Sequence, residues 1–266
     1  MRGRRVTLRE YGPYYAVAAF VLKPLCVLLT RKTWRGLEHV PAQGGVVLAA
    51  NHISHADPIV LADFVVFGAG RLARFLAKST LFQGWGPVAR IMRGAQQIPV
   101  HRGTADAAQA LEDAVAALQA GECVVVYPEG TVSRDPDKWP MQARTGVARL
   151  ALMSGAPVVP IGQWGAERLL DSYRGNKVHV PATVQVVAGP PVDLSAFQGR
   201  EHTAELLDAV TDEIMGAITA IVEELRGEKA PEGVHQRQAA RSRHAPRPST
   251  GGPGGGTDRH DQRRTA

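Results

Sequence analysis

The segment NHISHADP, residues 51–58, places two histidines and an aspartate between the apolar runs 44–50 and 59–67. His52 and Asp57 are five positions apart, so on one α-helix their side chains would be rotated by about 500° and would not share a face. The sequence instead predicts a strand that ends near Ala50 and a helix that begins at Asp57, with Pro58 in its first turn. Across such a turn the imidazole and the carboxylate can meet.

Three interpretations of this pair are open. In the first, Asp57 is a helix N-cap and His52 is an ordinary loop histidine. The second is a metal site, which needs further ligands, and the sequence contains neither HExxH nor CxxC. In the third, Asp57 fixes the tautomer and orientation of His52, and the imidazole removes a proton. Because no G-x-S-x-G elbow occurs, the third interpretation makes a substrate hydroxyl the nucleophile.

More polar stretches follow predicted strands. QQIPVHRG (96–103) places Arg102 between a strand and a helix start, where a guanidinium and helix amides could bind a phosphate. An ordinary surface arginine is the alternative. Ligands of open α/β sheets bind at the carboxyl ends of the strands. Two further stretches, GAPVVPIGQWG (155–165) and VVVYPEGTVSRD (124–135), are also predicted to lie at the carboxyl ends of strands. The second stretch contributes Glu129, Gly130, Thr131, Ser133 and Arg134, and a simple turn is the alternative interpretation of it.

Short apolar runs alternate with helical patterns along the body of the chain. This alternation predicts an α/β fold with a mixed, largely parallel sheet flanked by helices. Predicted strands are 45–50, 72–77, 95–100, 123–127, 157–162 and 183–188, and predicted helices are 104–119, 142–153 and 201–225.

Charge divides the chain into three parts, which we interpret as an N-terminal segment, one domain and a tail. Residues 1–35 contain eight Lys/Arg and one Asp/Glu, residues 36–227 fifteen and twenty, and residues 228–266 eight and four. Basic ends on an acidic body are not the pattern of a nucleic-acid binder. The tail is rich in Gly, Pro, Arg and Ser and is predicted to be disordered.

The N-terminal segment carries an apolar run, residues 14–30, that Lys23 and Pro24 interrupt. The run is too short to span a bilayer, and no small-residue cleavage site follows it. Because cations flank it on both sides, we expect a pair of helices that lie in the interface of an anionic membrane. A buried core helix is the alternative. Cys26 and Cys123 lie in apolar runs and are predicted to be reduced core thiols of an intracellular protein.

Four blocks in this order, NHISHAD, QQIPVHR, YPEGT and APVVPIG, resemble those of the glycerolipid acyltransferases, and most closely the bacterial 1-acylglycerol-3-phosphate acyltransferases. The resemblance implies an α/β fold, no metal and no cofactor. It implies transfer of a fatty acyl group from acyl-CoA or acyl carrier protein to the sn-2 hydroxyl of lysophosphatidic acid, giving phosphatidic acid. It also implies peripheral or monotopic attachment to the cytoplasmic face of the cell membrane.

The resemblance also assigns roles. His52 would be the base and Asp57 would stabilise the imidazolium, while backbone amides around Gly130 could bind the oxyanion. Arg102 would hold the phosphate headgroup, with Glu129 and Gly130 shaping the loop.

One position departs from the family. Val132 stands where the family's third block has an arginine, and Arg134 follows two residues later. Either Arg134 takes over that contact or Arg102 holds the phosphate with less help. Other functions that we considered are acyl transfer to a different lyso-lipid, a non-catalytic peripheral lipid-binding protein and a metal-dependent phosphohydrolase.

Overall fold

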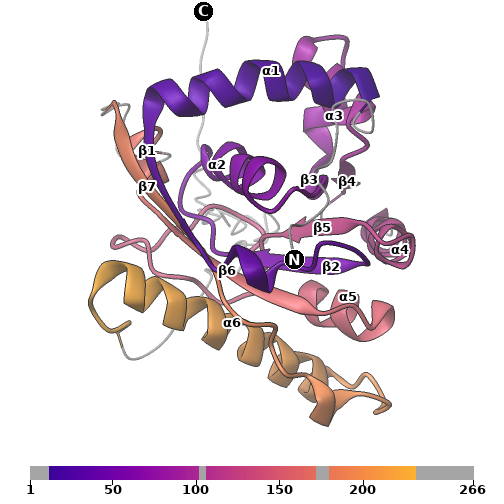
Figure 1. Ribbon diagram of the computed structural model, residues 1–266. Coiled ribbons are helices and arrows are strands. Elements are labelled where there is room, and N and C mark those ends of the chain that lie inside the picture. The colour runs from indigo at the N-terminus through magenta and orange to yellow at the C-terminus, as the bar shows by residue number, and fades with distance from the viewer. Residues whose placement is uncertain (1–11, 102–105, 172–179, 232–266) are drawn as a thin grey trace, which may run out of the picture. The chain divides into compact units, whose positions relative to one another are not determined.

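The computed structural model describes residues 12–101, 106–171 and 180–231. In these ranges a seven-stranded sheet has the order β1-β7-β6-β2-β5-β3-β4, with helices on both faces (Figure 1). Only the β6–β7 pair is antiparallel. The predicted mixed, largely parallel sheet is therefore confirmed. The strands are β1 (Thr30–Arg35), β2 (Val46–Ala50), β3 (Ala73–Lys78), β4 (Ile98–Val100), β5 (Cys123–Val126), β6 (Val158–Trp164) and β7 (Ala182–Ala188).

Helices α4, α5 and α6 cover one face of the sheet, and α1 and α2 lie over the other (Figure 1). Side chains of a strand point alternately to the two faces, so Val47 and Ala49 of β2 pack toward α4–α6 and Leu48 packs toward α2. Because both faces are covered, the central strands are apolar at every position. The helices are α1 (Gly12–Leu29), α2 (Asp57–Asp63), α3 (Pro87–Gly94), α4 (Asp106–Gln119), α5 (Gly146–Ser154) and α6 (Ala204–Arg226).

The N-terminal segment differs from the expected pair of helices. Its described residues, 12–35, form one helix, α1, which contains Pro24, and then strand β1, which runs parallel to β7. Side chains of β1 alternate between half-buried and exposed, which is the pattern of an edge strand. Lys32 pairs with the buried carboxylate of Asp63 at 2.7 Å, and Trp34 packs edge-on against Phe64. This short charged strand carries no apolar run that would have predicted it.

One face of α1 packs on the domain. The hydroxyl of Tyr15 donates to the Ala73 carbonyl at 2.8 Å, and the Cys26 thiol is buried and unpaired, as is that of Cys123. The opposite face is exposed although it is also apolar, and Phe20 is 83% exposed. None of the helices in the described ranges has the length and apolar character that crossing a bilayer requires. Other exposed members of this face are Val17, Val21, Leu25 and Leu28.

The last helix, α6, is capped at its start by Thr203, whose hydroxyl accepts the Leu206 amide, and at its end by Gly227, which has a positive φ of 71°. Beyond it, Ala230 donates its amide to Glu223 at 2.9 Å. The first residues of the predicted tail thus contact the helix, and residues 232–266 lie outside the described ranges.

Candidate active site

Strand β2 lies between β5 and β6, and all three run in the same direction. Their carboxyl ends therefore meet at one edge of the sheet, where ligands of α/β proteins bind. The loop 51–57 follows β2, the turn 127–131 follows β5, and Gln163 lies near the end of β6. The structure thus brings together three polar stretches that are far apart in the sequence.

His52 and Asp57 are in direct contact across the predicted turn. Nδ1 of His52 lies 2.8 Å from Oδ2 of Asp57. The same carboxylate oxygen accepts the backbone amides of Ile53 at 2.6 Å and Ser54 at 2.8 Å. The N-cap of α2 is Ala56, and the Asp57 side chain binds the preceding loop and not the helix. The structure therefore does not show the N-cap that the first interpretation assigned to Asp57.

The contact between His52 and Asp57 is largely shielded from water. Asp57 is fully buried, and the His52 side chain is 14% exposed. A carboxylate withdrawn from water must be compensated by donors, and here two amides and an imidazole supply them. Because Nδ1 is engaged by Asp57, Nε2 is the ring nitrogen that can exchange a proton with a substrate.

The ring of Tyr127 stacks on the imidazole, with centroids 4.2 Å apart and planes 19° from parallel. Burial raises the pKa of Tyr127 well above its usual value, and the nearby Asp57 carboxylate raises it further. The phenol is therefore neutral and serves as a flat wall against which His52 is held. Sequence reasoning quoted Tyr127 within YPEGT but gave it no role.

The start of the loop is fixed to β6 by two amide side chains that sequence reasoning missed. Asn51 donates to the Gln163 carbonyl at 3.0 Å and accepts the Gln163 amide at 2.8 Å. Gln163 in turn donates through its side chain to the Asn51 carbonyl at 2.7 Å. Both residues are fully buried, and each lies near the end of an apolar strand within a polar stretch that the sequence analysis singled out without giving the residue a role.

Glu129 connects two loops of the site. Its Oε1 accepts the His52 amide at 2.9 Å, and its Oε2 accepts the Met141 amide at 3.1 Å. It is fully buried, and its carboxylate joins the loop after β2 to the segment that contains Met141. The Gly130 amide donates to the Tyr127 carbonyl at 2.9 Å, closing the turn. This amide is therefore engaged within its own turn, and the binding of an oxyanion by backbone amides around Gly130 stays a prediction.

The predicted headgroup contacts are only partly described. Arg102 lies outside the described residues. Val132 is buried, Thr131 is half-buried and Arg134 is exposed. Arg144, which sequence reasoning did not single out, donates its amide to the Pro128 carbonyl and so lies beside the turn after β5.

The loop 131–141 is held from the C-terminal end of α6. The Arg226 guanidinium lies between the rings of Trp139, at 3.9 Å, and Trp164, at 4.6 Å, and donates to the Asp137 carbonyl at 2.6 Å. Within the loop, the Ser133 hydroxyl donates to the Trp139 carbonyl at 2.8 Å. The Ser133 amide donates to the His52 carbonyl at 2.6 Å, so these contacts connect α6 with the loop that carries His52.

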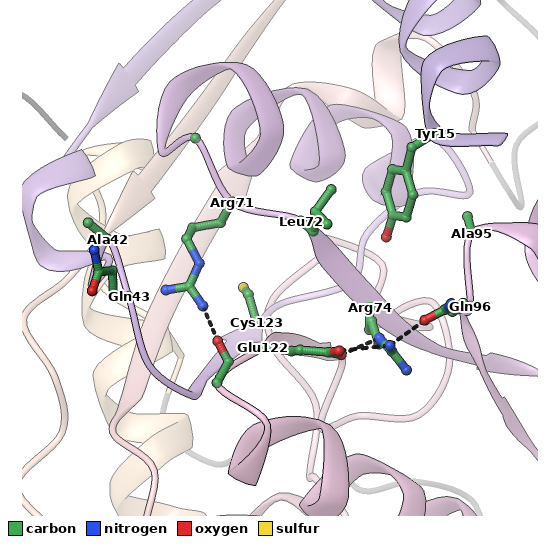
Figure 2. A pocket seen from close by; sticks show the side chains of 12 residues that line it. Tyr15, Ala42, Gln43, Arg71, Leu72, Arg74, Ala95, Gln96, Glu122 and Cys123 are labelled. Atoms are coloured by element: carbon green, nitrogen blue, oxygen red, sulfur yellow. Dashed lines mark hydrogen bonds and ion pairs between the residues drawn. The ribbon is translucent and has the colours of Figure 1, made fainter. Parts of the chain in front are cut away.

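A cavity of about 370 Å³ lies at the other edge of the sheet, next to the amino ends of β3 and β5 (Figure 2). Arg71 donates there to the carbonyls of Gly44, at 2.7 Å, and Gly121, at 2.9 Å, while Arg74 pairs with Glu122. These contacts tie loops together at the end opposite His52. Among the described residues, no group of three or more His, Cys, Asp or Glu side chains is arranged to hold a metal ion.

Comparison with known proteins connects this geometry to a family. Residues 31–164 match the family model described as "Acyltransferase". The chain is 26% identical over 184 residues to a Bacillus subtilis 1-acyl-sn-glycerol-3-phosphate acyltransferase, covering 66% of this chain and 83% of that protein. A Borreliella burgdorferi protein of the same name is 27% identical over 186 residues, covering 67% and 70%.

Among solved structures, the LPA acyltransferase PlsC of Thermotoga maritima has a similar fold. The TM-score is 0.59 at 24% identity, over 83% of this chain and 86% of that one. At this identity the likeness concerns the fold alone.

We expect Arg226→Ala to loosen the loop 131–141. Removal of a desolvated guanidinium from two aromatic faces should lower the free energy of unfolding by about 1–2 kcal/mol. Amide exchange at Ser133 and Met141 should accelerate. Denaturant unfolding and hydrogen exchange measure both effects, and Arg149→Ala on α5, an exposed arginine, is the control. Unchanged exchange in the Arg226 variant would show that the loop is held by other contacts.

Proposed function

This chain belongs to the acyltransferase family, and we propose that it transfers a fatty acyl group to the sn-2 hydroxyl of lysophosphatidic acid, giving phosphatidic acid. The contact of His52 with the buried carboxylate of Asp57 carries the proposal. This contact provides an oriented base. Because the sequence contains no G-x-S-x-G elbow, the nucleophile is the hydroxyl of the substrate and not a serine of the protein. The names of the two bacterial relatives support lysophosphatidic acid as the acceptor.

The proposed reaction is a direct attack of the acceptor on a thioester. Nε2 of His52 takes the proton of the sn-2 hydroxyl as its oxygen bonds to the thioester carbonyl carbon. The carbon–sulfur bond then breaks, and the imidazolium returns the proton to the leaving thiolate. An alkanol is a weak nucleophile at neutral pH, and such base catalysis is worth about 10²–10⁴-fold in rate. Asp57 stabilises the imidazolium that forms in between.

The acceptor's phosphate requires cations near the same edge. Arg134 is exposed on the loop after β5, and Arg144 follows that loop and adjoins the turn that begins at Tyr127. Together with Arg102, which follows β4 in the sequence and lies outside the described residues, these arginines are the proposed headgroup contacts. The burial of Val132 supports Arg134 as the residue that replaces the family's arginine.

An assay of the purified full chain tests the activity. Acyl-CoA and acyl-acyl carrier protein, both thioesters, are offered as donors with a panel of lyso-lipid acceptors, and products are identified by mass. We expect phosphatidic acid to form fastest. If a lysophospholipid with a larger headgroup is acylated fastest, the protein is instead an acyltransferase that acts on that lipid.

His52→Ala should lower kcat by at least about 10²-fold, because the variant lacks the base. Asp57→Asn should also cost orders of magnitude, because it disturbs the tautomer of His52. His55→Ala, which removes an exposed histidine of the same loop, is the matched control. Melting temperatures show whether each variant folds. A near-normal kcat in the folded His52 variant would remove His52 from the mechanism.

Arg134→Ala should raise KM for lysophosphatidic acid by about tenfold, since a charge-assisted contact contributes about 1.5–3 kcal/mol. Its effect on an acceptor without a phosphate should be small. Arg149→Ala serves again as the control for loss of a surface cation. Equal KM increases for both acceptors would show that Arg134 acts on the loop and not on the phosphate.

We further propose that the protein acts on the cytoplasmic face of the cell membrane, seated through the exposed face of α1. A helix that is apolar on all faces is usually buried on all sides. Helix α1 packs on the domain with only one face, so its exposed apolar face is free to contact lipid. Residues 12–35 contain four cations and no acid, which suits an anionic surface.

Substitution tests this seat better than deletion, because removing residues 1–35 would also remove β1 from the sheet. Phe20→Ser with Leu28→Ser should strongly reduce binding to phosphatidylglycerol vesicles and raise KM for vesicle-borne acceptor. Binding of the wild type should weaken at high salt but persist, since its apolar part is not screened. Unchanged sedimentation of the double variant with vesicles would place the seat elsewhere.

A further inference from the structure

A second exposed apolar group lies on the segment 79–94, far from α1 in the sequence. Trp85 is 85% exposed, more than any other large apolar side chain in the described ranges. Leu81 and Val88, on either side of it, are 45% and 57% exposed. The other three tryptophans of the chain are buried or half-buried, so the exposure of Trp85 is a local property of this segment.

The segment presents Trp85 on a built turn. The Arg93 guanidinium donates to the carbonyl of Phe82 and, at 3.1 Å, to that of Gly84. Gly84 has a positive φ of 81°, which glycine adopts without strain, and helix α3 then begins at Pro87. The indole is thus held outward by contacts that span the turn.

This turn adjoins the membrane seat proposed above. Gly94, at the end of α3, lies so close to Tyr14 of α1 that a Cβ atom there would be 2.2 Å from the ring. Figure 1 shows α3 beside the same end of α1. The second apolar group therefore belongs to an element that packs directly on the helix with the exposed apolar face.

Charge identifies the partner. Residues 78–94 contain Lys78, Arg90 and Arg93 and no acid, within a body of the chain in which Asp and Glu outnumber Lys and Arg. All three cations are exposed. Tryptophan between an apolar phase and water, with cations around it, is the composition of a membrane-interface anchor.

We propose that Trp85, with Leu81 and Val88, is a second membrane contact that enters the headgroup region of an anionic phospholipid bilayer beside α1. This inference rests on the proposed membrane seat. A single interfacial helix can roll about its own axis, and a second contact away from that axis fixes the roll. Fixing it also fixes the direction in which the His52 edge of the sheet faces the lipid.

The test uses the full chain, phosphatidylglycerol vesicles that contain brominated lipid, and tryptophan fluorescence. Bromine should quench the wild type, and Trp85→Phe should lose most of that quenching. Trp85→Ser should reduce vesicle partitioning by about tenfold, roughly the effect of keeping one large apolar side chain in water. Met153→Ser, which removes an exposed apolar side chain from α5 on the other face of the sheet, should change nothing.

Kinetics provide an independent readout. Trp85→Ser should lower kcat/KM on vesicle-borne acceptor and leave the rate on a short-chain, water-soluble acceptor unchanged. If the wild type does not bind vesicles, the membrane seat and this inference both fail. If it binds, but Trp85 is not quenched and Trp85→Ser partitions like the wild type, only the second contact is wrong. A raised KM for acyl carrier protein with unchanged partitioning would instead make this a protein-docking surface.

Discussion

The rest of the site depends on the hydrogen bonds that the buried carboxylate of Asp57 accepts. One oxygen accepts the His52 imidazole and two amides of the loop that carries it, all within 2.8 Å. Without these donors, burial of the charge would cost several kcal/mol. The loop between β2 and α2 is therefore restricted to the conformation that also aims the imidazole. The loop is stabilised and the His52 imidazole is oriented by the same carboxylate.

Neighbouring strands then hold that loop from both sides. Asn51 fastens its start to β6, Glu129 of the turn after β5 accepts the His52 amide, and Ser54 donates its hydroxyl to the Leu170 carbonyl at 2.6 Å. In each of these hydrogen bonds, the donor or the acceptor is a backbone group. The arrangement of the loop therefore depends on the geometry of the sheet more than on exposed side chains. Such preorganisation suits the proposed role of His52, which requires the imidazole to meet a hydroxyl brought by the substrate.

Much of this could be predicted from sequence, because the signals were local. Each of the six predicted strands is present, since continuous apolar runs mark strands covered on both faces. The turn that joins His52 to Asp57 followed from a strand end and a Pro58 helix start. What failed depended on tertiary contacts. Strand β1 is charged and exists because β7 pairs with it, and β7 lies about 150 positions later in the sequence.

The charge distribution places a constraint on how such a domain reaches a lipid. Residues 36–227 carry an excess of five acidic groups, so an anionic membrane repels the body as a whole. At physiological salt this repulsion decays within about 8 Å, and so does the attraction of cations on α1 and α3. Whether the domain binds the membrane is therefore decided only by the side chains that touch it. An apolar face edged by cations gains from both lipid tails and headgroups there, while the acidic remainder of the domain lies beyond the screening distance and opposes the contact only weakly.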